Sequence, residues 1–175
     1  MHGLRDYDIA FVGLPQGVSH FDFRITKAFF DQFPNSIIEN ADVRVHMDFE
    51  KQPSFFLLKF HMSGTIEQHC YRCHALLEMP VSFERQVVVK FEADVEDDED
   101  DGDADVIYIR RSDTHLSVAQ HIYDFLTLCL LEYRASCDQL PEPRACDPEV
   151  LARLHTAEPV RADARWAELK NIKIH

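Results

Sequence analysis

The chain has 175 residues, 46% of them hydrophobic and 11% aromatic, and carries 18 Lys and Arg against 31 Asp and Glu, a formal net charge of −13. This length predicts a single domain over residues 1–175. The composition excludes a disordered chain, a collagen-like repeat and a dense disulfide scaffold. A net charge this negative also argues against binding nucleic acid through bulk charge.

The acidity is concentrated in one segment. Ten acidic residues and no basic ones lie between Glu92 and Asp105, and the chain without this stretch has 21 acidic and 18 basic residues, a net of −3. Because like charges repel one another and cannot pack, we predict a solvated acidic loop over residues 92–105. A second interpretation is that the segment mimics a polyanion and engages a basic protein.

Before the acidic segment, alternation of apolar and polar residues is typical of strands. A short helix is predicted within Thr26–Phe33, ending before Pro34. The residues from about Phe55 to Val95 predict an antiparallel hairpin with Cys70 and Cys73 at or near its tip. The strand-like segments give a β-rich part over residues 5–110: Asp8–Leu14, Phe21–Ile25, Val43–Phe49, Phe55–Ile66, Val81–Val95 and, after the acidic loop, Val106–Ile109.

After residue 110 the pattern changes to helical spacing, which predicts a helical part over residues 114–172. Thr114 or Ser117 can cap a helix that ends near Tyr133, and Asp147-Pro148-Glu149 is a typical helix start. A last short helix is predicted over Asp163–Lys170. The expected fold class is α+β: a mostly antiparallel sheet in the N-terminal two-thirds, with C-terminal helices packed on it.

The sequence indicates a cytoplasmic protein without membrane association. The N-terminus lacks a basic region followed by an apolar stretch, and no apolar run approaches the roughly 18 residues that span a bilayer. In the reducing cytoplasm, five cysteines point to free thiols or a metal site rather than to disulfides.

The cysteines carry the most informative motif. Two thiolates three residues apart, as in Cys70-Tyr71-Arg72-Cys73, can occupy two tetrahedral positions on one zinc ion, and Cys137 and Cys146 are the candidates for the other two. Cys129, on the apolar face of the predicted long helix, is expected to be a buried thiol. Nearby histidines are spare ligand candidates: His69, His74 and His155.

Two other interpretations of Cys70 and Cys73 stay open at this point. They could pack as reduced thiols without metal, or form a redox pair. A redox pair is disfavoured because a thioredoxin-like motif follows a βαβ pattern and opens a helix, whereas here the flanking residues predict a hairpin.

The order of these features over about residues 5–172 resembles the YceD family, the large ribosomal RNA subunit accumulation proteins. The similar elements are Gly64–Cys73 with its Cys-x-Arg-Cys ending, the acidic loop, the short strand, the helix Leu116–Leu131, Cys137, Cys146-Asp147 and the closing Asp163–Lys170. The chain departs from the family where relatives often have His in place of Cys137, and in the turn Leu131–Arg134.

The resemblance implies a non-enzymatic ribosome-biogenesis factor that supports the synthesis, processing or stability of 23S ribosomal RNA, with a structural zinc site. Its implied partners are ribosomal RNA or pre-ribosomal proteins. Candidates for RNA contact are basic and aromatic residues near the cysteine turn, on neighbouring strands and in the tail, although no strongly basic face is evident and action through a protein partner is favoured. The basic ones are Arg72, Arg85, Lys59, Lys90, Arg110, Arg111, Arg161, Arg165, Lys170 and Lys173, and the aromatic ones are Tyr71, Phe55, Phe56 and Phe60. Two alternatives are a metal-free adaptor without direct RNA binding and a thiol-dependent enzyme that uses Cys70 or Cys73. The sequence leaves the oligomeric state open.

Overall fold

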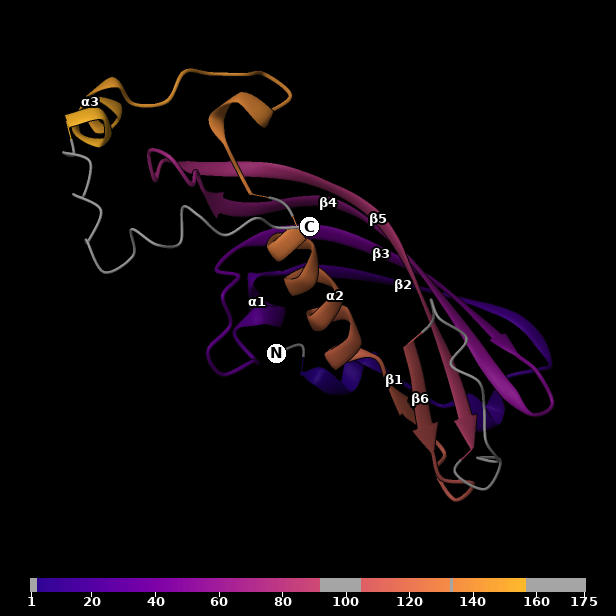
Figure 1. Ribbon diagram of the computed structural model, residues 1–175. Coiled ribbons are helices and arrows are strands. Elements are labelled where there is room, and N and C mark those ends of the chain that lie inside the picture. Colours follow the sequence, from indigo (N-terminus) through magenta and orange to yellow (C-terminus); the bar gives the residue numbers. More distant parts are fainter. Residues whose placement is uncertain (1–2, 92–104, 133, 157–175) are drawn as a thin grey trace, which may run out of the picture.

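In the computed structural model, which describes residues 3–91, 105–132 and 134–156, a helix lies across one face of a bent five-stranded sheet (Figure 1). The spatial order is β2-β3-β4-β5-β6. Neighbours are antiparallel except β6, which runs parallel to β5. The strands are β2 (Gly17–Thr26), β3 (Ala41–Lys51), β4 (Phe55–His69), β5 (Leu76–Phe91) and β6 (Asp105–Ile109).

The remaining elements frame this sheet. Two short strands, β1 (Asp8–Ile9) and β7 (Leu116–Ser117), pair with each other. The helices are α1 (Lys27–Phe30), α2 (Ala119–Glu132) and α3 (Pro148–Thr156), with 3-10 turns at Leu4–Tyr7, Phe11–Gly13 and Cys137–Gln139.

The predicted α+β class is confirmed, and α2 forms most of the second layer. Helical spacing places Ile122, Phe125 and Leu126 on one face of α2, where all three are buried against the sheet. The Phe125 ring packs edge-on to Phe60 of β4, with 5.5 Å between the ring centroids. Burial of each such side chain stabilises the fold by about 1.5–3 kcal/mol.

The predicted strands were mostly correct, with one error near the N-terminus. The expected strand Asp8–Leu14 ends at Ile9, because β7 offers only two residues for pairing. The chain then turns through the 3-10 helix at Phe11–Gly13, which buries the Phe11 ring in the core. The same pairing explains why α2 begins at Ala119, after β7, rather than directly after Thr114.

The predicted β4–β5 hairpin is confirmed, and its pairing runs from Phe55 opposite Lys90 to His69 opposite Leu76. Side chains alternate between the two faces, so β3 buries every second residue from Ala41 to Phe49 in the core and directs the others outward. Pro80 fits within β5 because the described part of β6 pairs only with Val87–Phe91, which leaves Pro80 on a sheet edge.

Three predictions lie wholly or largely outside the described residues: the acidic loop over residues 92–105, the helix at Asp163–Lys170 and the side chain of His155. The single domain over residues 1–175 stays a prediction. Among the described helices, none combines the length and apolar character needed to cross a bilayer.

Gly64 of β4 allows an unusually close approach to β3, and its replacement gives a first test of the sheet. A Cβ atom at this position would lie 2.1 Å from the backbone oxygen of Asp42, and φ is +156°. We expect Gly64→Ala to lower the free energy of unfolding by about 2 kcal/mol or more, measured by urea denaturation. The matched control is Gly13→Ala, where nothing lies within 4 Å of the added methyl. Equal stability of the two variants would contradict this account.

Candidate metal centre

The turn that joins β4 to β5 positions the first two thiols. The Cys70 N–H donates to the Ala75 oxygen at 2.9 Å, and the His74 N–H donates to the Cys70 oxygen at 2.8 Å. His74 adopts φ +60°, a left-handed conformation that reverses the chain within the turn. This tight backbone brings the side chains of Cys70 and Cys73 to the same side, as the sequence predicted for the hairpin tip.

The segment after α2 folds back on this turn and supplies the other two thiols. The Tyr71 N–H donates to the Ala135 oxygen at 3.0 Å, which fixes the entry of the segment. The Arg144 N–H donates to the Cys137 oxygen at 3.0 Å, and its guanidinium donates to the Leu76 oxygen at 2.9 Å. These bonds replace regular secondary structure in a stretch interrupted by prolines, and they hold Cys137 and Cys146 beside the turn.

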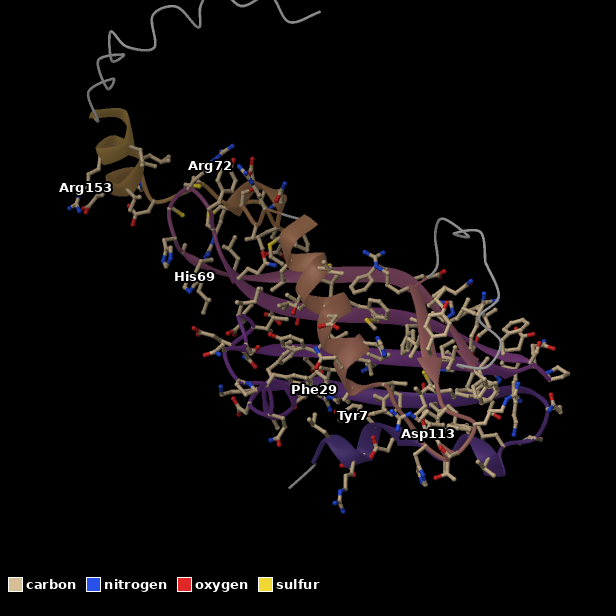
Figure 2. All side chains as sticks on the ribbon, turned by 60° about the horizontal axis from the view of Figure 1, so that its bottom comes forward. Tyr7, Phe29, His69, Arg72, Asp113 and Arg153 are labelled. Carbon is tan, nitrogen blue, oxygen red and sulfur yellow. The ribbon has the colours of Figure 1, made fainter. Side chains whose placement is uncertain are left out.

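The four sulfur atoms form one compact group at the β4–β5 turn, the end of the hairpin where Arg72 lies (Figure 2). All four Sγ atoms lie within 4.8 Å of one another. The Cys73–Cys137 Sγ distance is 3.6 Å and the Cys70–Cys146 distance is 3.8 Å. A disulfide would require about 2.05 Å, whereas a tetrahedral zinc with bonds of about 2.3 Å separates its sulfurs by about 3.8 Å. The geometry therefore fits a divalent metal bound by four thiolates.

The four cysteines belong to a second apolar cluster, smaller than the main core. Cys70 and Cys137 are each 1% exposed and Cys73 is 7% exposed, while Cys146 is half-buried. Leu77 and Ala135 are buried with them, and partly buried apolar residues surround the group: Ala75, Met79, Leu140 and Val150. The sulfurs are thus shielded from solvent and from oxidants.

The pKa is lowered for two of the four thiols and raised for the other two. Burial opposes ionisation of Cys70, but N–H groups led by that of Cys73 outweigh it and lower the Cys70 pKa to about 6. The pKa of Cys73 is also lowered, first by the backbone N–H of Asp147 at the start of α3. Burial raises the pKa of Cys137 and, together with the neighbouring sulfurs, raises that of Cys146 to about 12. Four thiolates this close would repel one another strongly, and a divalent cation removes that repulsion.

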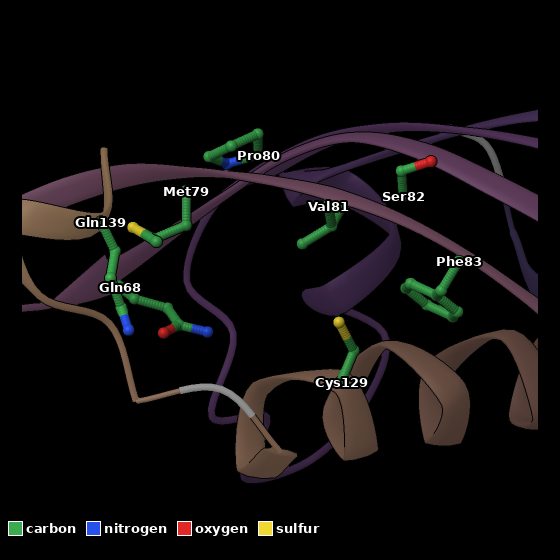
Figure 3. A pocket seen from close by; sticks show the side chains of 8 residues that line it. All are labelled: Gln68, Met79, Pro80, Val81, Ser82, Phe83, Cys129 and Gln139. Atoms are coloured by element: carbon green, nitrogen blue, oxygen red, sulfur yellow. The ribbon is translucent and has the colours of Figure 1, made fainter. Parts of the chain in front are cut away.

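The other sulfur and imidazole candidates stand apart from this group. His69 and His74 stack on each other with 4.2 Å between ring centroids, and His69 Nδ1 lies 3.0 Å from the His74 oxygen. Cys129 is buried in α2, as predicted, and lines a cavity of about 300 Å³ between α2 and β5, with Met79 and Val81 across from it (Figure 3).

Sequence reasoning identified the thiols but missed the residues that bring them together. Arg144 is the clearest case, because its backbone and guanidinium join the Cys137 loop to β5. In the sequence it is one arginine between two prolines and a cysteine, and no spacing rule links it to Leu76. The position of Asp147 could be predicted, because Asp147-Pro148-Glu149 is a typical helix start. Its carboxylate caps α3 by accepting a hydrogen bond from the Glu149 N–H at 2.8 Å.

Fold and site together define an α+β protein whose hairpin tip is joined to a C-terminal segment by four clustered cysteines. The profile of the family described as large ribosomal RNA subunit accumulation protein YceD matches residues 58–173, about two thirds of the chain and all four cysteines. The chain therefore belongs to the YceD family. No curated protein and no solved structure matches it.

Proposed function

We propose that this chain is a non-enzymatic ribosome-biogenesis factor that supports the synthesis, processing or stability of 23S ribosomal RNA, and that it holds a structural zinc ion. The observation that carries the proposal is the family match over residues 58–173, which spans the four clustered cysteines. The family's description names accumulation of the large ribosomal RNA subunit as the process concerned.

Zinc is the ion that the donor set favours. Four thiolates are soft ligands, and a tetrahedral group of four sulfurs is the usual composition of structural zinc sites. Cys70, Cys73, Cys137 and Cys146 would hold the ion, which would supply folding energy to a segment that lacks its own hydrophobic core. The bound ion links the end of the sheet to the start of α3.

The same arrangement supports a non-enzymatic role for these thiols. Four protein ligands leave a tetrahedral ion with no open position for a substrate or a water molecule. Each sulfur is directed at the other three and, except for Cys146, is almost fully buried. A nucleophilic or redox cysteine needs access to its substrate, which this packing withholds.

The hairpin tip provides the contact surface that we propose for a pre-ribosomal particle. Tyr71 is 53% exposed, and the Arg72 guanidinium lies 5.2 Å from the centroid of its ring. Arg72 Nε also donates to the Tyr71 hydroxyl at 2.7 Å, so the two side chains form one exposed unit. An aromatic ring beside a guanidinium can stack on an unpaired base, and the metal centre beneath it keeps the turn rigid.

Metal analysis tests the zinc proposal. We expect tag-free protein, purified without chelator and dialysed against metal-free buffer to empty exposed sites, to contain about one zinc per chain. Cys73→Ala should then contain almost none, because three thiolates bind far more weakly than four. Amide exchange in Cys70–Leu77 should become about tenfold faster or more in Cys73→Ala, while exchange in β3 changes little. The measurements are elemental analysis and hydrogen exchange followed by mass spectrometry.

The matched control is Cys129→Ala, which removes a buried thiol of α2 that is not part of the cluster. This variant should keep its zinc and its protection at the hairpin tip. Full exchange protection of the tip in metal-free wild-type protein would contradict a structural role for zinc.

A cellular experiment tests the ribosomal role. Cells that lack the gene should contain less 23S relative to 16S ribosomal RNA, and the wild-type gene should restore the ratio. The double variant Tyr71→Ala/Arg72→Ala should bind large-subunit precursor particles about tenfold more weakly, because loss of one stacking contact costs about 1–3 kcal/mol. Co-sedimentation and crosslinking measure the binding and show whether RNA or protein is contacted.

Arg24→Ala is the control for this variant, since Arg24 is also exposed and pairs with a carboxylate, Asp42, but lies on β2. It should restore the 23S ratio and bind particles as the wild type does. An unchanged 23S to 16S ratio in cells without the gene would overturn the proposed function.

A further inference from the structure

The outer face of the sheet, opposite α2, carries a row of histidines and carboxylates that the cysteine centre does not use. The strand register aligns four residues across four strands: Asp22 on β2, His46 on β3, His61 on β4 and Glu84 on β5. Beside this row, His20 of β2 lies opposite Asp48 of β3. Residues of both kinds therefore meet on one exposed surface.

The two carboxylates at the ends of the row orient the imidazoles between them. His46 Nδ1 lies 2.8 Å from Asp22 Oδ1, and His61 Nδ1 lies 3.0 Å from Glu84 Oε1. Because an ionised carboxylate only accepts hydrogen bonds, each Nδ1 carries the proton, which leaves a lone pair on Nε2 of the neutral ring. Histidines that bind metal are oriented by carboxylates in this manner.

Both Nε2 atoms are directed toward the carboxylate of Asp48. The distance from Asp48 Oδ1 is 3.2 Å to His46 Nε2 and 2.7 Å to His20 Nδ1, and Asp48 Oδ2 lies 4.0 Å from His61 Nε2. The ligand atoms of His20, His46 and Asp48 all lie within 4.8 Å of one another. Tetrahedral ligands at about 2.0–2.1 Å from a metal are separated by about 3.3 Å, a value inside the 2.7–4.0 Å range of these distances.

The cluster sets three imidazoles beside three carboxylates, those of Asp22, Asp48 and Glu84. The ring centroid of His46 lies 5.5 Å from that of His20 and 6.2 Å from that of His61, so neighbouring rings are close enough to bind one ion. One divalent ion bound by neutral rings would use the Nε2 lone pairs of His46 and His61.

The geometry points to a second metal site, for a divalent first-row transition ion, with His20, His46 and Asp48 as ligands and His61 as the fourth. Asp22 and Glu84 are the positioning residues. Imidazole nitrogens with one carboxylate favour ions such as zinc or cobalt over magnesium and calcium, which prefer oxygen.

This second site is separate from the cysteine centre in space, chemistry and exposure. The nine residue steps of extended chain from His61 to Cys70 span about 30 Å. The side chains of His20 and His46 are 61% and 46% exposed, so ions in solution reach them directly. The family match begins at residue 58, after His20, His46 and Asp48. These three ligands therefore lie outside the part of the chain that matches the family.

Cobalt titration of the full-length, tag-free protein, after its zinc has been removed, tests the inference. Co²⁺ bound to thiolates gives intense near-ultraviolet charge-transfer bands, whereas Co²⁺ bound to imidazole and carboxylate gives only weaker visible bands. We expect a second equivalent of Co²⁺ that adds visible absorbance without new thiolate bands. It should also bind to Cys73→Ala, which makes the result independent of the proposed zinc centre.

Three variants assign the ligands. His46→Ala should abolish the second equivalent and keep the thiolate bands, which also report that the protein is folded. Asp22→Asn removes only the group that orients His46 and should weaken cobalt binding about tenfold or more. The control His115→Ala removes an exposed histidine that bonds to Thr114, outside the row, and should bind as the wild type does.

Two results would overturn the second site. One is a wild-type titration that ends with the thiolate-bound equivalent. The other is equal weakening by His115→Ala and His46→Ala, which would indicate nonspecific binding to surface histidines.

Discussion

The long pairing of β4 with β5 is the constraint on which both candidate sites depend. Its register continues without interruption from Phe55 opposite Lys90 to His69 opposite Leu76. At one end it delivers Cys70 and Cys73 on a turn that pairs with no further strand among the described residues. In its middle the same register places His61 opposite Glu84 and beside His46 of β3. A slip of one residue would invert both faces of the strand and dismantle the two groups together.

Local pattern was sufficient to predict much of this fold. The alternation in Val43–Phe49 required one buried face, and the β4–β5 hairpin followed from two such runs around a short polar segment. The parallel pairing of β6 with β5 could not be predicted, because it joins residues on either side of the acidic segment and depends on no local turn. The strand that contains β1 was predicted too long for a similar reason, since its length is set by β7, more than a hundred residues later.

The two sites differ in how much the sequence revealed. The four thiols could be selected from the sequence by the Cys-x-x-Cys spacing, by the proline-rich segment around Cys137 and Cys146 and by the helical pattern around Cys129. Their convergence depends on tertiary hydrogen bonds such as that of Arg144 to Leu76. Histidine and aspartate are common on exposed strands, so His20 and His46 carried no signal by themselves. Their meeting depends on the register between β2 and β3, which hydrophobic alternation does not determine beyond the choice of face.

The two sites differ in their ligand atoms and in their exposure to solvent, and this difference gives them different physical roles. A buried group of four thiolates holds its ion tightly. Losing the ion would make sulfurs take up protons and would remove the bonds that join the hairpin tip to the segment after α2, so occupancy is coupled to folding. The imidazole and carboxylate group lies on a sheet whose inner face is already stabilised by packing on α2. Its ion can leave without exposing any core residue. Occupancy there would follow the concentration of free metal, while the cysteine centre would stay filled as long as the hairpin tip is folded.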